Sequence, residues 1–328
     1  MALQHRHNHK YCKDPRTVVK LQPGLLTKEE EKTLSDIQET YLELLHDRLI
    51  EDITDGITLD TPIYRIDTLE HFKEALRKRE LYLANPCKWD DPWESFVLRG
   101  KAFLQDGTRI DISAMQDSYF AQCWSLVPES EGIWKSRCFG AWDSSGKRNE
   151  NKAINRLVKI KTTVRILMRE VYKIDDLCGH AKFCIGAVRY RTAHDINIMH
   201  ESSFKDPSLS SQERDIINSL LTKRIGYEYE GEVRLICHEN FEGKVSDGNI
   251  RDHIVLPNVD PRRFASEIVI DPWCPYDEFN RIKTELENEY KIYCIEKSPL
   301  LVESITPTIM FGKDCLVVTP TRIIAPQL

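Results

Sequence analysis

The sequence predicts an α+β fold, with a central sheet and helices packed around it. Strand candidates outnumber helix candidates along the 328 residues and do not alternate regularly with them, which argues against a doubly wound parallel sheet. Apolar residues make up 41% of the chain, enough for a sizeable core, and charged residues make up 30%, as in a soluble globular protein. At this length, one large domain with extensions is the leading expectation.

An N-terminal helix is predicted ahead of the main domain. Thr27 and Glu30 have the spacing of a capping box, and apolar residues then recur at helical intervals to about Ile53. This helix precedes the first strand candidate, so we expect it to be an extension that packs on the main domain or on a partner. The three predicted parts of the chain are an N-terminal arm and helical extension (1–56), the main domain (57–300) and a C-terminal strand and tail (301–328).

The main domain shows short apolar runs bounded by turn-forming residues, and longer segments with helical periodicity. The runs predict strands at Pro62–Ile66, Leu81–Ala84, Tyr119–Ser125, Val164–Leu167, Ala187–Tyr190, Ile254–Leu256, Glu267–Ile270, near Ile292 and at Cys315–Val318. The periodic segments predict helices that start after Asp67, that run from Ser210 to about Lys223 and that run from about Tyr276 to Tyr290.

Composition also narrows the cellular setting. No apolar run approaches the length of a bilayer span, and the N-terminal MALQHRHNHKYCK has no hydrophobic segment that could act as a signal peptide. The ten cysteines are scattered without a CxxC pair, which favours reduced, mostly buried thiols. We therefore expect a cytoplasmic protein without membrane contact. His5, His7, His9 and Cys12 lie in a polar arm with no second cluster nearby, so no metal site is predicted.

The stretch Tyr227–Ile236 is the most informative part of the chain. It places Glu228, Glu230 and Glu232 at alternate positions before an apolar tail, so a strand here would point all three carboxylates the same way. Carboxylates on one face repel each other, and a strand that accepts this cost usually lines a solvated cleft for a cationic or hydroxyl-bearing ligand. The alternative is a solvent-facing edge strand that uses charge to resist aggregation.

Charge is uneven along the chain. The net charge of −6 argues against a globally basic nucleic-acid binder, yet the segment from Lys135 to Arg169 is strongly basic and contains only Asp143 and Glu150 as acids. That excess could hold a phosphate-bearing ligand or a nucleic acid, and the alternative is a solvated loop and strand face. Its basic residues are Lys135, Arg137, Lys147, Arg148, Lys152, Arg156, Lys159, Lys161, Arg165 and Arg169.

Three elements follow one another in a suggestive order: Arg65 inside the first strand, Ser125 at the end of a middle strand, and Glu230-Gly231-Glu232 at the start of a later one. This order resembles the Arg–Ser–Glu class of the ADP-ribosyltransferase superfamily. The resemblance implies an ADP-ribosyltransferase-like central split β-sheet flanked by helices, with NAD as co-substrate. The N-terminal helical extension is not explained by it.

The resemblance also implies roles for individual residues. Arg65 would hold the NAD phosphates, and Ser125 would brace the nicotinamide ribose pocket. Glu232 would bond the ribose hydroxyl and stabilise the oxocarbenium ion, because a fixed carboxylate favours a cationic transition state. Glu230 would orient the acceptor nucleophile. The superfamily often has Ser-x-Ser at this point, whereas this chain has Cys123 in place of the first serine. This departure bears on the bracing role that the resemblance assigns to Ser125.

More broadly, residues from about 60 to 300 resemble an uncharacterised bacterial domain family. The shared motifs are a Tyr-Arg start, an Asn-Pro…Asp-Pro-x-Glu segment, an aromatic-Ser strand followed by a Trp, and a Lys…Tyr-Glu-x-Glu-x-Arg block. Here they read Tyr64-Arg65, Asn85-Pro86…Asp91-Pro92-Trp93-Glu94, Trp124-Ser125…Trp134 and Lys223…Tyr229-Glu230-Gly231-Glu232-Val233-Arg234.

Aromatic side chains near these motifs could stack on nicotinamide or adenine. Trp124, Trp134 and Tyr227 are the candidates, each with packing in the core as the alternative. The residues predicted to bind NAD are Trp124, Tyr64 of the Tyr-Arg motif, Arg65 and Ser125.

The resemblance implies an NAD-dependent mono-ADP-ribosyltransferase with a macromolecular acceptor. The basic segment favours a nucleic acid, RNA or DNA, over a protein acceptor. Modification of a cell's own macromolecules would be toxic, which suggests a toxin or phage-defence effector held in check by a neutralising antitoxin protein. Two alternatives stay open. One is a non-catalytic nucleotide-binding module. The other is a metal-dependent nuclease or phosphoesterase that uses Asp90, Asp91 and Glu94 with the row of glutamates.

Overall fold

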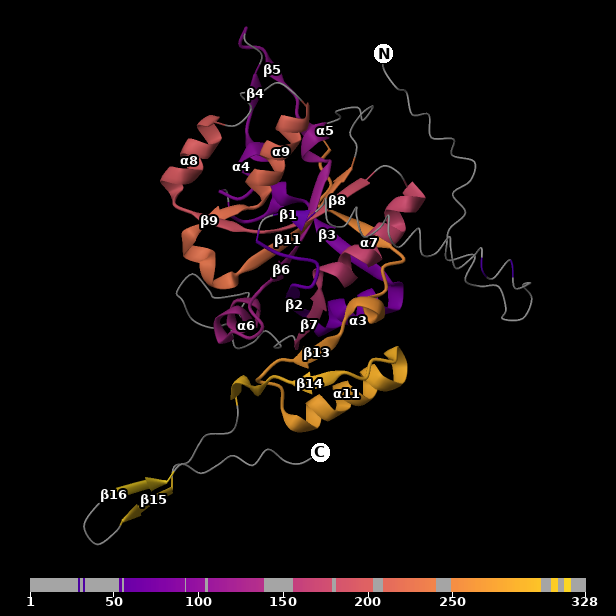
Figure 1. Ribbon diagram of the computed structural model, residues 1–328, viewed down its shortest axis with the longest axis vertical. Helices are drawn as coiled ribbons and strands as arrows, with labels where there is room; N and C mark the ends of the chain where they lie inside the picture. The colour runs from indigo at the N-terminus through magenta and orange to yellow at the C-terminus, as the bar shows by residue number, and fades with distance from the viewer. Residues whose placement is uncertain are drawn as a thin grey trace.

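The α+β class is confirmed by the structure, a computed structural model with a mixed central sheet and helices around it (Figure 1). The predicted N-terminal helix lies outside the described residues, apart from Glu29 and Lys32, which are helical. The structure describes residues 56–301 except 92, 104–105, 139–155, 179–180, 203–208 and 240–248, together with residues 29, 32, 53–54, 308–311 and 316–319.

One large sheet organises the described part of the chain. Most neighbouring strands in it are antiparallel, whereas β1 with β8 and β13 with β14 are parallel. Two further strands, β3 (Glu80–Ala84) and β12 (His253–Pro257), join it beside β6. The main path runs β1 (Ile53–Thr54), β8 (Ala181–Ala187), β11 (Glu232–Glu239), β6 (Tyr119–Ser125), β2 (Pro62–Thr68), β7 (Leu157–Thr163), β13 (Glu267–Ile270) and β14 (Ile295–Lys297).

The sheet forks at one edge of β6. The other edge of β6 pairs with β11 along its whole length. At the forked edge, β2 pairs with β6 only through Tyr64 opposite Ser125, and β3 pairs with it only through Ala84 opposite Ala121. Two strands therefore leave the same edge of β6 at different points, and the sheet opens between them.

Two side chains bridge this fork in place of ladder hydrogen bonds. Arg65 of β2 donates from Nη1 to the carbonyl of Cys123, 2.9 Å away. Gln122 of β6 donates from Nε2 to the carbonyl of Tyr82 on β3, also at 2.9 Å. Because buried backbone carbonyls need donors, these side chains satisfy groups that a continuous sheet would have paired.

Helices cover the sheet, and Figure 1 shows α11 and β14 at one end of the body with the β4–β5 hairpin projecting from the other. No described helix has the length and apolar character needed to cross a membrane. The helices are α3 (Leu69–Lys78), α4 (Phe96–Arg99), α5 (Ser113–Gln116), α6 (Glu131–Cys138), α7 (Val164–Cys178), α8 (Ala193–Ser202), α9 (Leu209–Leu220), α10 (Pro261–Phe264) and α11 (Tyr276–Tyr290), with 3₁₀ turns η1 (Pro86–Lys88), η2 (Ile225–Glu230) and η3 (Pro299–Leu301). Three small two-stranded sheets comprise β4 (Ala102–Phe103) with β5 (Arg109–Ile110), β9 (Arg189–Arg191) with β10 (Thr222–Arg224), and β15 (Thr308–Phe311) with β16 (Leu316–Thr319).

Helix α3 shows how local sequence sets these elements. The helix begins after Thr68, whose hydroxyl accepts from the backbone N–H of His71, and ends where Arg79 takes a left-handed conformation. Its buried residues are Leu69, Phe72 and Leu76, one face of the helix, and they join the main core cluster against the sheet.

Several sequence-based boundaries differ from the structure. The predicted strand Ala187–Tyr190 covers the end of β8 and the start of β9, which are separate strands, and the strand predicted near Ile292 is β14, at Ile295–Lys297. The predicted strand Val164–Leu167 is instead the first turn of α7, because its apolar run continues with helical spacing through Val171 and Tyr172, which are buried. The helix predicted from Ser210 to Lys223 ends at Leu220, and Lys223 lies in β10. By contrast, β6, β13 and α11 have the predicted bounds, because each is a clean apolar or periodic segment.

Candidate active site

A cleft of about 600 Å³ opens where the sheet forks. This volume lies in the range of small-molecule sites in proteins. The stacking candidates Trp134 and Tyr227 line the cleft, whereas Glu228 does not. The cleft also brings together the residues predicted for NAD binding and catalysis. These residues are Tyr64, Arg65, Trp124, Ser125, Glu230 and Glu232.

The glutamate-rich stretch has a different backbone from the predicted one. Glu228 and Glu230 lie in the 3₁₀ turn η2, and only Glu232 is in strand β11. The prediction that three carboxylates share one strand face is therefore wrong. The reason lies at Gly231, which ends the turn with φ of 48°, a left-handed conformation that favours glycine. As a result Glu228 is exposed, Glu230 is half-buried and Glu232 is buried.

Ser125 fastens this turn to the sheet. Its Oγ donates to the carbonyl of Glu230 at 2.6 Å and accepts from the backbone N–H of Val127 at 3.0 Å. A Cβ atom on Gly231 would come within 3.0 Å of the Val127 side chain, so the turn and the loop after β6 are in close contact. Ser125 thus positions the backbone that carries Glu230, and no described contact joins its hydroxyl to a carboxylate side chain.

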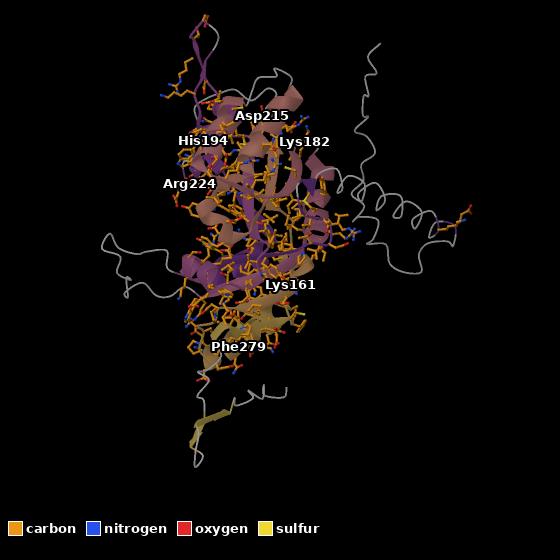
Figure 2. The ribbon with its side chains drawn as sticks, turned by 60° about the vertical axis from the view of Figure 1, so that its left-hand side comes forward. Lys161, Lys182, His194, Asp215, Arg224 and Phe279 are labelled. Carbon is orange, nitrogen blue, oxygen red and sulfur yellow. The ribbon has the colours of Figure 1, made fainter. Side chains whose placement is uncertain are left out.

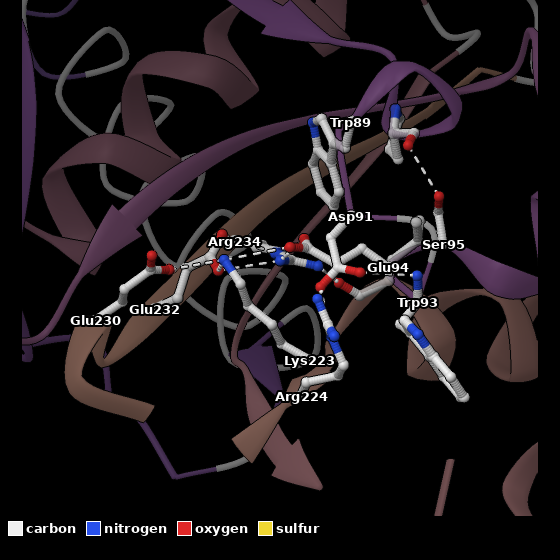
Figure 3. A network of polar contacts seen from close by, with 12 residues as sticks. Trp89, Asp91, Trp93, Glu94, Ser95, Lys223, Arg224, Glu230, Glu232 and Arg234 are labelled. Atoms are coloured by element: carbon white, nitrogen blue, oxygen red, sulfur yellow. Dashed lines mark hydrogen bonds and ion pairs between the residues drawn. The ribbon is translucent and has the colours of Figure 1, made fainter. Parts of the chain in front are cut away.

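Glu232 is held by the two cations nearest to it (Figure 3). Arg234 donates from Nε to Oε1 at 2.9 Å and from Nη2 to Oε2 at 3.0 Å, a two-armed contact. Lys223 adds a third bond, from Nζ to Oε2 at 3.1 Å. The backbone N–H of Glu232 donates to the hydroxyl of Tyr190 at 2.7 Å. The side chain of Glu232 is 6% exposed, so the carboxylate has little freedom to move.

Electrostatics keep this carboxylate ionised. Burial by itself raises the pKa of Glu232. Arg234 and then Lys223 lower it by a larger amount, so the pKa falls to about 2. Next to it, burial and the negative charge of Glu232 raise the pKa of the Cys123 thiol to about 12. Cys123 is therefore protonated at neutral pH and serves as a hydrogen-bond donor to Glu232.

Glu94 completes a buried charge network with these residues. Arg234 is fully buried, contacts Glu94 through Nη2, and donates to the carbonyl of Leu220 at 2.5 Å. Lys223 lies 3.2 Å from Glu94 and 2.7 Å from Glu230. Burial raises the pKa of Glu94, and Arg234 and Lys223 only partly oppose this. Burial lowers the pKa of Lys223, but Glu232 and Glu94 outweigh it, so the ammonium stays charged.

Sequence reasoning did not place Lys223 or Arg234 in the site, although both belong to the quoted motifs, and it named Glu94 only for the alternative nuclease. A signal was present at Arg234, which interrupts the apolar run of β11. An arginine in a buried strand requires an acidic partner, because an unpaired buried charge is very costly. Of its two acidic partners, Glu232 lies two residues earlier in the chain, whereas Glu94 could not be identified locally, since it is 140 residues away.

The predicted NAD-binding residues are tied into the fork. Besides its bond to Cys123, Arg65 donates from Nη2 to Asp67 at 3.0 Å, and its side chain is 21% exposed. Trp124 is 3% exposed, and its Nε1 donates to Gln122 at 3.0 Å, so it contacts the cleft from within the core. Arg137 also lines the cleft, and it has no ion pair with any residue that the structure describes.

The basic segment is largely neutralised in its described part. Lys161, labelled in Figure 2, pairs with Glu267 at 2.9 Å. Other members also contact acids, so these residues do not form the open basic surface that the sequence suggested. The remaining described pairs are Lys135 with Glu131, Arg156 with Asp271 and Glu278, Lys159 with Glu129, and Arg165 with Asp60. Lys147, Arg148 and Lys152 lie outside the described residues.

The acids named for a metal-dependent nuclease are arranged differently. Glu94, Glu230 and Glu232 surround Lys223, and Asp91 pairs with Arg224 at 3.0 Å. Within the described residues, no group of three or more His, Cys, Asp or Glu side chains has the geometry to hold a metal ion. Protein cations occupy the positions where a divalent ion would sit, so this donor set does not fit Mg²⁺.

The charge network should make stability depend on pH in the acid range. The folded-state pKa of Glu232 lies below the 4.5 of an ordinary glutamate, so its stabilisation is present above about pH 4.5 and is lost as the pH falls toward 2. The raised pKa of Glu94 acts in the opposite direction and offsets part of this loss. Urea unfolding between these pH values should therefore show a falling free energy in the wild type. A Glu232→Gln variant should show a shallower slope, whatever its absolute stability, and an equal slope would contradict the assignment.

Comparison with known proteins gives one distant similarity. No protein-family model matches the chain, and no curated protein matches it. Among solved structures, DarT of Thermus sp. 2.9 in complex with NAD+ is similar with a TM-score of 0.31 and 13% identity, over 74% of this chain and 98% of that one. The same DarT in complex with ADP-ribosylated ssDNA gives a TM-score of 0.31 and 12% identity, over 74% and 95% of the two chains. At these values the likeness supports no conclusion about the site.

Proposed function

We propose that this chain is an NAD-dependent mono-ADP-ribosyltransferase. The observation that supports this most directly is a fixed, ionised Glu232 in the same cleft as Arg65, at the fork of the sheet. In the proposed reaction the bond between nicotinamide and ribose C1′ breaks, and its electron pair leaves with nicotinamide. An acceptor oxygen or nitrogen then bonds to C1′ and gives up its proton. Positive charge develops on the ribose, and a preorganised carboxylate in a water-poor site stabilises that charge.

The cleft offers groups for each part of the dinucleotide. Arg65 and Arg137 are the cations proposed to meet the diphosphate, since a guanidinium matches phosphate oxygens in pairs. Ser125 braces the turn that bears Glu230, which we propose orients the acceptor nucleophile. Tyr64 is proposed as an aromatic wall. Trp124 would contribute only an edge, because its ring is buried.

The proposed acceptor is a macromolecule, with nucleic acid ahead of protein. This preference now depends on the part of the basic segment that includes Lys147, Arg148 and Lys152, because the described basic residues are mostly paired. Such an activity would harm the cell that makes it. We therefore propose a toxin or phage-defence effector with a neutralising protein partner, a proposal that rests on the family resemblance alone.

The test is incubation with NAD labelled in the adenylate phosphate, in separate pools of protein, RNA and DNA. The proposal expects label in one pool together with release of nicotinamide, and neither in the Glu232→Gln variant. Absence of both products in all three pools would overturn the proposal. NAD that binds without turnover would indicate a non-catalytic module. Cleavage of nucleic acid that needs no NAD and stops with a chelator would indicate the nuclease.

Arg65→Ala should weaken NAD binding about ten- to one hundredfold, because a hydrogen bond to a charged group contributes about 1.5–3 kcal/mol. Titration calorimetry measures this directly. Arg65 also bridges the fork, so Gln122→Met is the matched control, since it removes the other bridge without removing charge. Equal loss of affinity in the two variants would mean that Arg65 acts through the fork and does not contact phosphate.

A further inference from the structure

We propose that Glu94 sets the net charge of the buried network around Glu232 and thereby the preference of the candidate active site for a cationic ligand. Glu94 would act without touching the ligand, as a specificity-determining residue that balances one of the two cations holding Glu232. The ligand class is a nucleotide with a positively charged heteroaromatic ring, such as oxidised nicotinamide, over the neutral reduced form. This inference rests on the proposed function, and one of its tests does not need a ligand.

The buried network contains more acidic than basic side chains. The network contains the carboxylates of Glu94, Glu230 and Glu232 and the cations Lys223 and Arg234, so three negative charges face two positive ones. One negative charge is left over. Without Glu94, two carboxylates would balance two cations, and this buried network would be neutral.

The side chains of this network are mostly buried, and burial determines how strongly its net charge acts on a ligand. The side chains of Glu94, Lys223 and Glu232 are 8%, 10% and 6% exposed, and Arg234 is fully buried. Little water is present to screen the imbalance, so one charge here has a larger effect than on the surface. The most exposed member is Glu230, at 26%.

Glu230 and Glu232 differ in how many of their oxygen atoms accept hydrogen bonds from the protein. Both oxygens of Glu232 accept from Arg234, and Oε2 also accepts from Lys223, so its acceptor sites are largely filled. Glu230 accepts from Lys223 through Oε2, and its Oε1 has no hydrogen bond to another described residue. A ligand in the cleft would thus contact the carboxylate of Glu230, which is the more exposed of the two. The carboxylate of Glu232 lies next to it, fixed by Arg234 and Lys223, and would act on the ligand electrostatically (Figure 3).

Glu94 reaches the network from a separate segment. It lies between η1 and α4, and it contacts Arg234 and Lys223 from the side opposite Glu230 (Figure 3). Glu94 also lines the cleft wall, but its carboxylate oxygens are taken up by the two cations. Its position therefore suits a residue that tunes charge, because its side chain can be made neutral with little change in shape.

The first test compares binding of NAD+ and NADH, which differ by one positive charge on the nicotinamide ring. In the wild type we expect NAD+ to bind roughly tenfold more tightly, given one unscreened charge at close range. Glu94→Gln should bring the ratio of the two dissociation constants close to one, mainly by weakening NAD+, while NADH binding changes little. An equal loss of affinity for both ligands leaves the ratio unchanged, and in a variant that circular dichroism shows to be folded that result would overturn the proposal.

Two further variants separate charge from shape. Asp271→Asn is the matched control, because Asp271 is also a buried carboxylate that contacts an arginine, Arg156, but does not line the cleft. It should leave the ratio at the wild-type value. Combining Glu94→Gln with Lys223→Gln restores one surplus negative charge, so the preference for NAD+ should return. If the double variant still bound NAD+ and NADH with nearly equal affinity, Glu94 would not act through the net charge of the network.

A ligand-free measurement keeps the inference separate from the proposed function. Glu94 is among the groups that raise the pKa of Lys223, so the Lys223 ammonium should lose its proton at lower pH in Glu94→Gln. Nitrogen NMR of labelled lysine follows that titration. An unchanged titration would overturn the role of Glu94 even if the protein cleaves NAD. If the wild type binds neither dinucleotide, the proposed function fails, and the Lys223 titration alone decides whether Glu94 sets the charge.

Discussion

Glu232→Gln is expected to lower the rate of NAD cleavage by about 10²–10³-fold while changing NAD affinity little. Glutamine keeps the size and most hydrogen-bonding capacity of the side chain but removes the charge that a cationic transition state requires. The ground state depends less on that charge, so the loss should appear in the rate of the bound complex. Single-turnover release of nicotinamide measures the rate, and calorimetry measures the affinity.

The control for this variant is Glu228→Gln, four residues earlier and exposed to solvent. It removes the same charge from the same sequence motif and should leave the rate at the wild-type value. Full activity in Glu232→Gln would move the catalytic role to Glu230 or Glu228. The variant must also be shown to be folded, because it leaves Arg234 with one buried carboxylate, Glu94, as its remaining acidic contact.

Arg234→Met should lower the free energy of unfolding by about 3–5 kcal/mol, a large effect for one substitution. Methionine fills much of the space, but Glu232 and Glu94 lose their shared cation and remain buried with only Lys223 to balance them. An unpaired buried carboxylate is costly, because neither water nor a counter-ion compensates it. Urea unfolding at neutral pH measures the change.

Arg251→Met is the comparison for this effect. Arg251 also contacts two carboxylates, Asp117 and Glu239, but its side chain is 43% exposed. Surface ion pairs contribute about 0–1 kcal/mol, so this variant should lose far less. If the two arginine variants lost similar amounts, the network around Arg234 would have to be solvated in solution, which contradicts its burial.

Much of the fold followed from local pattern. Strand β6 and helix α11 were predicted with their observed bounds because each carries an uninterrupted signal, apolar in one case and periodic in the other. The order of Arg65, Ser125 and Glu232 also led to one cleft, since Ser125 of β6 lies opposite Glu232 of β11 on one edge and opposite Tyr64, the neighbour of Arg65, on the other. The roles assigned to these residues, and the domain limits 1–56, 57–300 and 301–328, stay predictions.

The missed features depend on distance and on backbone geometry. Alternating glutamates suggested a strand, but Gly231 allows a left-handed turn that alternation cannot reveal. The pairing of Arg234 with Glu94 joins residues 140 positions apart, and no local pattern encodes it. The basic segment looked unpaired because its acids, such as Glu267 and Asp271, come later in the chain.

The fork bridged by Arg65 gives the sheet a seam between two slabs. On one side β2, β7, β13 and β14 form a slab, and on the other β6, β11 and β8 form a second, joined at the seam by one residue pair and the Arg65 guanidinium. A ligand that draws Arg65 onto its phosphates takes that guanidinium from the carbonyl of Cys123. We therefore expect occupancy of the cleft to change amide exchange along the seam, whose residues line the cleft.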